Sequence, residues 1–152
     1  MDQVLSKYDF KSGLGYKLTR AATILQFAVD QALEPQGLTR MSWIVLASVR
    51  FDGKSTVTQV ARHIEMERTA VSRIVSQLER DGVLARTKSL SDGRATALGV
   101  TEKGEDLCQK VPDIVQAAAA PHLMDLSPNQ VTQLGSLLDV IEAGDAPFMS
   151  GK

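Results

Sequence analysis

The sequence contains very little cysteine. Its one cysteine, Cys108 among 152 residues, excludes an intrachain disulfide framework and is typical of proteins from a reducing compartment. Long hydrophobic runs are absent as well, since no apolar stretch approaches the roughly 20 residues that span a bilayer. The first residues lack the basic and then apolar layout of a signal peptide. We therefore expect a cytoplasmic protein without a membrane partner.

The short motifs of common enzyme classes are also missing. The sequence has no P-loop, no GxGxxG dinucleotide-binding turn and no GxSxG nucleophile elbow. Its two histidines, His63 and His122, lie far apart in the sequence and join no Cys/His cluster, which argues against a metal site. We expect no catalytic residues, no metal ligands and no cofactor.

The charges that are present are distributed unevenly. The whole chain has a net charge of −1 and, with 43% hydrophobic residues, the composition of one globular domain. Residues 54–103 hold nine Lys/Arg and six Asp/Glu, a net of +3, which leaves −4 for the rest of the chain. A basic segment on an acidic remainder is the electrostatic footprint of a nucleic-acid-binding protein. A chance fluctuation is the alternative.

Residues 67–80 show the clearest helical pattern. Apolar residues recur there at the i, i+3, i+4, i+7 spacing of a helix with one buried face, at Val71, Ile74, Val75 and Leu78. The opposite face carries hydroxyl and guanidinium groups, on Thr69, Ser72, Arg73, Ser76 and Arg80. Such groups contact base edges and phosphates when a helix lies in a major groove. The alternative is a face that is only solvated.

A shorter helix is predicted directly before this one. Thr56 is expected to begin it in a capping box with Gln59, in which each side chain bonds the other residue's backbone. Its apolar residues lie on one face that matches the apolar face of the next helix. Only residues 65–67 separate the two helices, which is the short connection of a helix-turn-helix.

A hairpin is predicted after the second helix. Residues 83–87 and 95–100 have the pattern of strands, and residues 89–94 form the loop that joins them. Thr101 then begins a further helix as its N-cap. Inside that helix, Pro112 is expected to cause a bend or a break.

Together these elements predict a mainly α fold with a small β-hairpin wing. We expect a winged helix-turn-helix lobe over residues 53–104 and a helical dimerisation region over 1–36 and 105–146. Apolar faces on the helices at both ends of the chain have nothing within one small domain to cover them all. Packing against a second copy of the chain covers them, so we expect a two-fold homodimer.

An ordered set of short segments resembles the MarR family of bacterial transcriptional regulators. The matching segments are Gly37-Leu38-Thr39 with Trp43 and Leu46, Val60-Ala61, Val71-Ser72-Arg73, Leu78-Glu79-Arg80-Asp81-Gly82, Leu84, Arg86, Asp92-Gly93-Arg94 and Thr101-Glu102-Lys103-Gly104. Gly99 departs from the family pattern and weakens its strand locally. The resemblance implies a single MarR-like domain over 1–152 and a dimer with interleaved terminal helices. It also implies two winged lobes on double-stranded DNA with a pseudo-palindromic operator, and a small phenolic or anionic effector.

The resemblance and the helix pattern together assign roles to the basic and polar side chains. Near the helix start, Arg68 and Thr69 are expected to select bases, whereas residues farther along clamp phosphates. Arg94 at the hairpin tip is expected to enter a minor groove, where negative potential is focused; an ordinary surface charge is the alternative. Asp92 orients it. The full predicted DNA-binding set is Arg68, Thr69, Ser72, Arg73, Ser76, Arg80, Arg86, Lys88, Asp92 and Arg94.

An effector pocket is predicted from four residues, Tyr16, Arg20, Met41 and Trp43. For Trp43 the alternative is a place in the core, and for Arg20 it is an ion pair with an acid such as Asp30 or Glu34. Cys108 is not expected to sense oxidants, because its acidic neighbours Glu105 and Asp106 oppose a lowered thiol pKa.

The sequence therefore predicts a DNA-binding transcriptional regulator, a ligand-responsive repressor that acts as a dimer. A winged-helix protein-interaction module, or a DNA-binding protein without sequence preference, is the alternative. A protein without preference would show salt-dependent binding and no preferred duplex. The missing motifs argue against an enzyme.

Overall fold

The computed structural model describes residues 9–88 and 96–143 and consists of helices with one two-stranded sheet. After a short 3-10 turn at Phe10–Ser12, the elements follow the order expected for a winged helix-turn-helix with helical extensions. They are α1 (Leu14–Leu33), a 3-10 turn (Glu34–Gln36), α2 (Arg40–Arg50), α3 (Val57–His63), α4 (Arg68–Arg80), β1 (Leu84–Lys88), β2 (Thr96–Val100), α5 (Glu102–Leu123) and α6 (Pro128–Glu142). The predicted fold class is confirmed.

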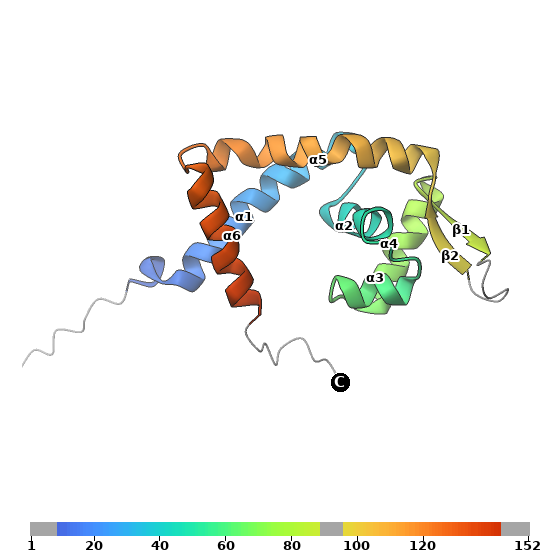
Figure 1. Ribbon diagram of the computed structural model, residues 1–152, viewed down its shortest axis with the longest axis horizontal. Helices are drawn as coiled ribbons and strands as arrows, with labels where there is room; N and C mark the ends of the chain where they lie inside the picture. The colour runs from blue at the N-terminus through green and yellow to red at the C-terminus, as the bar shows by residue number, and fades with distance from the viewer. Residues whose placement is uncertain (1–8, 89–95, 144–152) are drawn as a thin grey trace, which may run out of the picture.

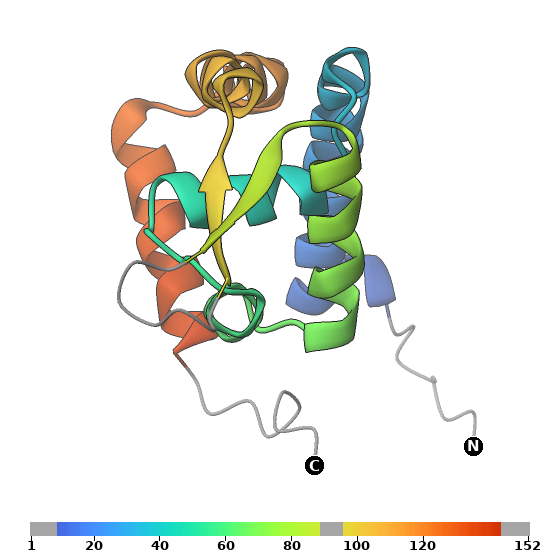
Figure 2. The ribbon, with the colours of Figure 1, turned by 90° about the vertical axis from the view of Figure 1, so that its right-hand side faces the viewer.

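The helices form two parts that share α5 (Figure 1). In the figure α5 runs along the top edge, α1 crosses beneath one half of it, and α6 folds down from its end. Below the other half lies a lobe of α2, α3, α4 and the hairpin. The hairpin lies in front of α2, with α4 beside it and α3 at the base of the lobe (Figure 2).

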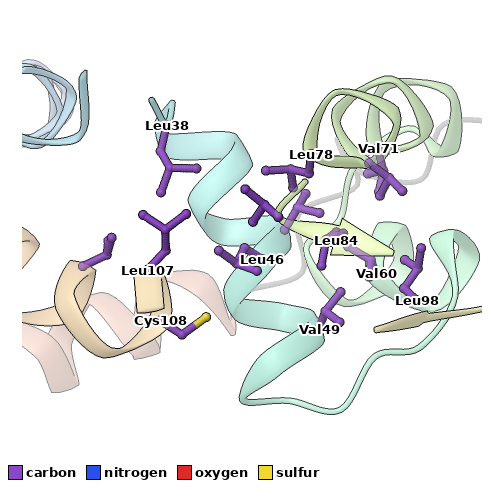
Figure 3. Packing of buried hydrophobic residues seen from close by; sticks show 14 of the residues in the cluster. Leu38, Leu46, Val49, Val60, Val71, Leu78, Leu84, Leu98, Leu107 and Cys108 are labelled. Atoms are coloured by element: carbon purple, nitrogen blue, oxygen red, sulfur yellow. The ribbon is translucent and has the colours of Figure 1, made fainter. Parts of the chain in front are cut away.

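One hydrophobic core holds the lobe together and extends to α5 (Figure 3). Val45 and Leu46 of α2 are fully buried at its centre, although α2 lies between the two predicted regions, 53–104 and 1–36. The other buried members come from every helix of the lobe, both strands, and α1 and α5: Leu33, Leu38, Val49, Val60, Ala61, Val71, Val75, Leu78, Val83, Leu84, Leu98, Leu107, Cys108 and Val111.

The turn between α3 and α4 follows from local backbone chemistry. Thr56 caps α3, since its hydroxyl accepts from the Gln59 N–H at 3.1 Å, so that half of the predicted capping box is confirmed. The reciprocal half is wrong, because the Gln59 side chain accepts from Ser55 N–H instead. Glu65 adopts a left-handed backbone with φ of 53°, which reverses the chain tightly before α4 begins at Arg68.

The hairpin is antiparallel, with Arg86 opposite Leu98 and Ala85 opposite Gly99. Its first strand begins at Leu84, one residue later than predicted, because the N–H of Val83 closes the end of α4 by donating to Leu78 O at 2.8 Å. Gly82 makes that closure with φ of 71°, a conformation that favours glycine.

A bend or a break was predicted at Pro112, and the break is wrong because α5 runs unbroken through that residue. A proline inside a helix removes one backbone hydrogen bond, and α5 contains a second one, Pro121. Buried contacts by Leu107 and Val111 hold the N-terminal half of the helix against the core. Packing therefore outweighs the local cost of the proline.

Apolar faces at the ends of the chain are not covered within one molecule. Leu33 is the one buried residue of α1, and no residue of α6 is buried. Large hydrophobic side chains stay exposed on both helices, namely Leu14, Ile24, Phe27, Val131, Leu134, Leu137, Val140 and Ile141. Several large apolar side chains exposed on the same two helices indicate an interaction site. Among residues 9–88 and 96–143, no helix is long and apolar enough to cross a membrane.

Candidate nucleic-acid interface

The polar face of α4 is presented to solvent as the sequence predicts. Val71, Val75 and Leu78 are buried and fix the rotation of the helix. On the other side, Thr69 and Arg73 are exposed, together with Arg68 and Arg80. Ser72 and Ser76 lie half-buried at the edges of this face. A helix anchored on one side and lined with hydroxyls and guanidiniums on the other has the layout of a major-groove reader.

Arg68 connects this face to the helix before it. Its Nε donates to the Thr58 hydroxyl of α3 at 3.1 Å. The guanidinium is therefore held at the start of α4, where a recognition helix places the residues that contact bases. The sequence pattern placed Arg68 at the helix start but did not indicate this contact with α3.

Two of the predicted phosphate contacts are occupied within the chain. Arg86 pairs with Glu79, with the Nε and Oε1 atoms 2.9 Å apart. Arg80 donates to the Gln77 side chain, whose amide in turn donates to Asp81. Both arginines are exposed. The Arg86 pair joins β1 to α4, whereas the Arg80 contact lies within α4.

The tip of the wing lies outside the described residues. Lys88 ends β1, and Asp92 and Arg94 fall in the segment 89–95, which the structure does not describe. What the structure does place is the base of the wing. The two strands β1 and β2 extend from near α5 toward the level of α3 (Figure 2).

The four predicted effector residues come from two helices. Met41 and Trp43 lie half-buried on α2, whereas Tyr16 and Arg20 lie exposed in the first half of α1. Trp43 packs against the core and meets Phe51 edge to face, with ring centroids 6.3 Å apart. This contact favours the core interpretation of Trp43.

A hollow does exist where α1 meets α2, with a volume of about 530 Å³. Its lining differs from the predicted one and consists of Asp30, Gln31, Glu34, Gly37, Leu38 and Thr39. Asp30 and Glu34 supply two carboxylates to this lining.

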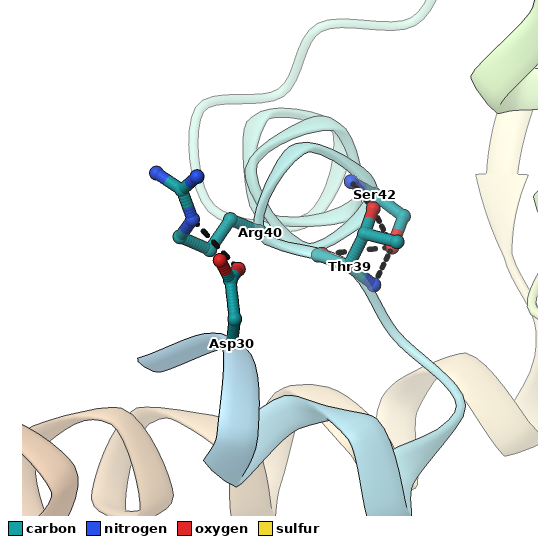
Figure 4. A network of polar contacts seen from close by, with 4 residues as sticks. All are labelled: Asp30, Thr39, Arg40 and Ser42. Carbon is teal, nitrogen blue, oxygen red and sulfur yellow. Dashed lines mark hydrogen bonds and ion pairs between the residues drawn. The ribbon is translucent and has the colours of Figure 1, made fainter. Parts of the chain in front are cut away.

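Ion pairs fasten both ends of α2 to the long helices. Arg40 pairs with Asp30 of α1 at 2.7 Å, beside the capping box that Thr39 forms with Ser42 (Figure 4). This pair takes up Asp30, one of the two acids that the sequence suggested for Arg20. At the other end, Arg50 pairs with Glu105 of α5 at 2.6 Å. Because α2 also packs in the lobe core, it links the lobe to the helices that carry the uncovered apolar faces.

Cys108 lies against this link and is buried, with 5% of its surface exposed. Burial raises the pKa of its thiol, the negative charge of Glu105 raises it further, and Arg50 opposes both effects. A raised pKa means less reactive thiolate at neutral pH. The structure thus supports the expectation that Cys108 is not an oxidant sensor.

Sequence reasoning missed one basic cluster. Lys54, Arg62 and His63 line a second hollow beside α3. The sequence did contain a signal for it, since Thr58 and Arg62 are four residues apart and therefore share one exposed helix face.

Comparisons with known proteins agree with this architecture. A sequence model of the MarR family matches residues 36–95. CouR from Rhodococcus jostii, solved with p-coumaroyl-CoA, is 25% identical with a TM-score of 0.79, over 91% of this chain and 97% of that one. A MarR family protein of Mycobacterium tuberculosis in complex with DNA is 26% identical with a TM-score of 0.71, over 85% of this chain and 97% of that one. The structure of the same protein with salicylic acid is 29% identical with a TM-score of 0.68, and the match covers 85% of this chain and 96% of that one.

Proposed function

This chain belongs to the MarR family, and we propose that it represses transcription by binding a pseudo-palindromic operator as a homodimer until a small ligand releases it. Proteins of this family are transcriptional regulators and not enzymes. A protein that binds chromosomal DNA acts where the DNA is, so we place it in the cytoplasm. The observation that carries the proposal is the exposed polar face of α4, with a relative of the same fold solved on DNA.

The proposed DNA contacts divide into two kinds. Arg68 and Thr69 at the start of α4 read base edges, while Ser72, Arg73 and Ser76 position the helix on the backbone. Around the wing, Arg80, Arg86 and Lys88 add phosphate contacts, and Arg94, oriented by Asp92, enters the minor groove. Such a division predicts that variants in the first group change which duplex is preferred, and that variants in the second change how tightly any duplex is held.

The proposed dimer is supported by the exposed apolar side chains of α1 and α6. Packing these faces against a second copy buries them and places two lobes side by side. In this arrangement residues 1–36 and 105–146 serve dimerisation, and 53–104 with α2 serve DNA binding. Two recognition helices then meet half-sites about one turn of DNA apart, roughly 34 Å.

An effector is proposed to act by changing the spacing of the two lobes. A ligand held between the long helices and α2 favours the dimer in which the lobes no longer match the half-sites, which is a shift between two populated states. The proposed contacts are Tyr16, Arg20, Met41 and Trp43, and a small phenolic acid is the class of ligand. Relatives solved with salicylic acid and with p-coumaroyl-CoA support that class.

Salicylate is the probe that tests this proposal. Saturating salicylate should weaken operator binding by the wild-type protein, measured by fluorescence anisotropy, and Arg20→Ala should reduce that response because the carboxylate loses its cationic partner. Lys17→Ala, which removes the same charge from an exposed position of α1, should respond like the wild type. Unchanged affinity with salicylate and with related phenolic acids would contradict regulation by this class of ligand.

Loss of the wing arginine should weaken operator binding without unfolding the protein. We expect Arg94→Ala to lower the affinity by about tenfold or more, because a guanidinium in a narrow minor groove gains from the focused potential. Anisotropy titrations measure the affinity, and circular dichroism with size-exclusion chromatography checks fold and dimer. Wild-type affinity in this variant would remove the wing from the proposed interface.

A further inference from the structure

We propose that the basic hollow beside α3 binds phosphate groups of the DNA backbone, which extends the DNA-binding surface beyond α4 and the wing. The hollow has a volume of about 380 Å³ and is lined by Gly53, Lys54, Gln59, Arg62 and His63. The DNA contacts proposed for α4 and the wing use none of these residues. The inference rests on the proposed function, since it names a further part of the same protein–DNA contact.

The hollow adjoins the recognition helix through α3. Thr58, whose hydroxyl accepts from Arg68, lies four residues before Arg62, so the two share the exposed face of α3. The exposed polar side chains of Arg68, Thr58 and Arg62 thus lead from the start of α4 across α3 to the hollow. In a helix-turn-helix the first helix crosses the DNA backbone while the second enters the groove, which brings phosphates to this surface.

The charges of the hollow suit an oxyanion. Lys54 and Arg62 both carry positive charge at neutral pH, and no carboxylate is among the described residues that line the hollow. The carboxylate of Asp52 lies 3.0 Å from Nε2 of His63 and is held by that contact. Guanidinium and ammonium groups are the side chains that proteins use to hold phosphate.

The loop that carries Lys54 is fixed before any ligand binds. The Lys54 N–H donates to Ser48 O of α2 at 3.0 Å, and Ser55 O accepts from the Leu98 N–H of β2 at 2.7 Å. The loop is therefore tied to the lobe core on both sides. A site that is already ordered loses little conformational entropy on binding.

Salt dependence of DNA binding tests the assignment. We compare the wild type with Arg62→Gln, Lys54→Gln and the double variant, on the preferred operator and on a scrambled duplex, at a series of salt concentrations. Removing one phosphate contact should lower the slope of log K against log salt by about 0.9, so a dimer of the double variant should show a slope lower by about 3.6. Affinity should fall by about the same factor on both duplexes, which leaves the preference for the operator unchanged.

Lys110→Gln is the matched control. It removes one exposed positive charge from α5, which lies along the opposite edge of the molecule from α3 (Figure 1), and it should keep the wild-type slope. Thermal unfolding checks that each variant keeps its fold. Size-exclusion chromatography checks that each variant is still a dimer, including Lys110→Gln, which lies in the proposed dimerisation region.

Operator preference and salt slope test the two proposals separately. A wild-type preference for the operator, combined with equal slopes in all variants, overturns the phosphate assignment alone. No operator preference in the wild type overturns the proposed function, while a lower slope of the double variant on scrambled duplex still supports the hollow as a backbone contact. If inorganic phosphate shifts the His63 ring resonances and the slopes stay equal, the hollow holds a free phosphate group and the backbone assignment is wrong.

Discussion

Replacing Gly104 by alanine is expected to destabilise the protein by about 2–3 kcal/mol, near the upper end of the range for overpacking a core. A methyl group on Gly104 would collide with the backbone carbonyl oxygen of Val83 and with a side-chain methyl of Val100. A rotamer change cannot relieve a collision with backbone. The first turn of α5 would have to move away from the hairpin.

That movement would break the contacts which hold α5 to the lobe. Thr101 caps α5 by accepting from the Gly104 N–H at 3.1 Å, and its own N–H donates to Val83 O at the same distance. The Thr101 hydroxyl also donates toward the carbonyls of Gly82 and Val83. One extra methyl group therefore strains several hydrogen bonds at the junction between the wing and the helix that leads to the dimer region.

Urea denaturation measures this effect, and Gly99→Ala is its matched control. Gly99 lies in β2 of the same lobe, and among the described residues a methyl group there would meet only Ala85 O, at an ordinary 3.8 Å. Because alanine has less backbone entropy to lose than glycine, this variant should be neutral or more stable by up to about 1 kcal/mol. Equal stability of the two variants would show that the close approach of α5 to Val83 O is not as described.

Replacing Arg68 and Thr69 by alanine should abolish most of the preference for the operator. Each contact between a side chain and a base edge contributes about 1–3 kcal/mol of discrimination, which corresponds to roughly 5- to 150-fold. The double variant should therefore bind operator and scrambled duplex almost alike. Its affinity for scrambled duplex should fall only by the contribution of the one positive charge that each protomer lacks.

Arg73→Ala is the control for this experiment. It removes an exposed arginine from the middle of the same face of α4, where the proposed contact is a phosphate, so it should weaken binding to both duplexes and keep their ratio. Anisotropy titrations on the two duplexes give both quantities. A loss of preference in Arg73→Ala, with none in the double variant, would reverse the proposed roles of the two ends of the helix.

The periodic helices were predictable because burial dictates their pattern. The spacing of Val71, Val75 and Leu78 is sufficient to place the polar face of α4, and Thr56 and Thr101 mark helix starts by a local hydrogen bond that sequence alone reveals. Element ends were less predictable. The strand β1 begins late because the Val83 N–H donates to Leu78 O at the end of α4 and not to a neighbouring strand. Which of these acceptors it uses depends on how the chain folds back.

Contacts between distant segments were not predictable from spacing. Asp30 pairs with Arg40 across a chain reversal, and Arg50 reaches Glu105 on another helix. The same holds for the basic hollow, in which Lys54 from a loop joins Arg62 from α3. Periodicity reports which face of a helix is buried, whereas these sites arise from where separate elements end in space.

Selection of bound duplexes from a random-sequence library tests the central claim most directly, namely that the face of α4 reads DNA sequence in a dimer. The wild type is predicted to enrich a pseudo-palindrome whose half-sites lie about one helical turn apart, and the Arg68→Ala, Thr69→Ala double variant to enrich no sequence. A wild-type protein that enriches no sequence and releases all duplexes at moderate salt would contradict the claim, because such binding is electrostatic and non-specific.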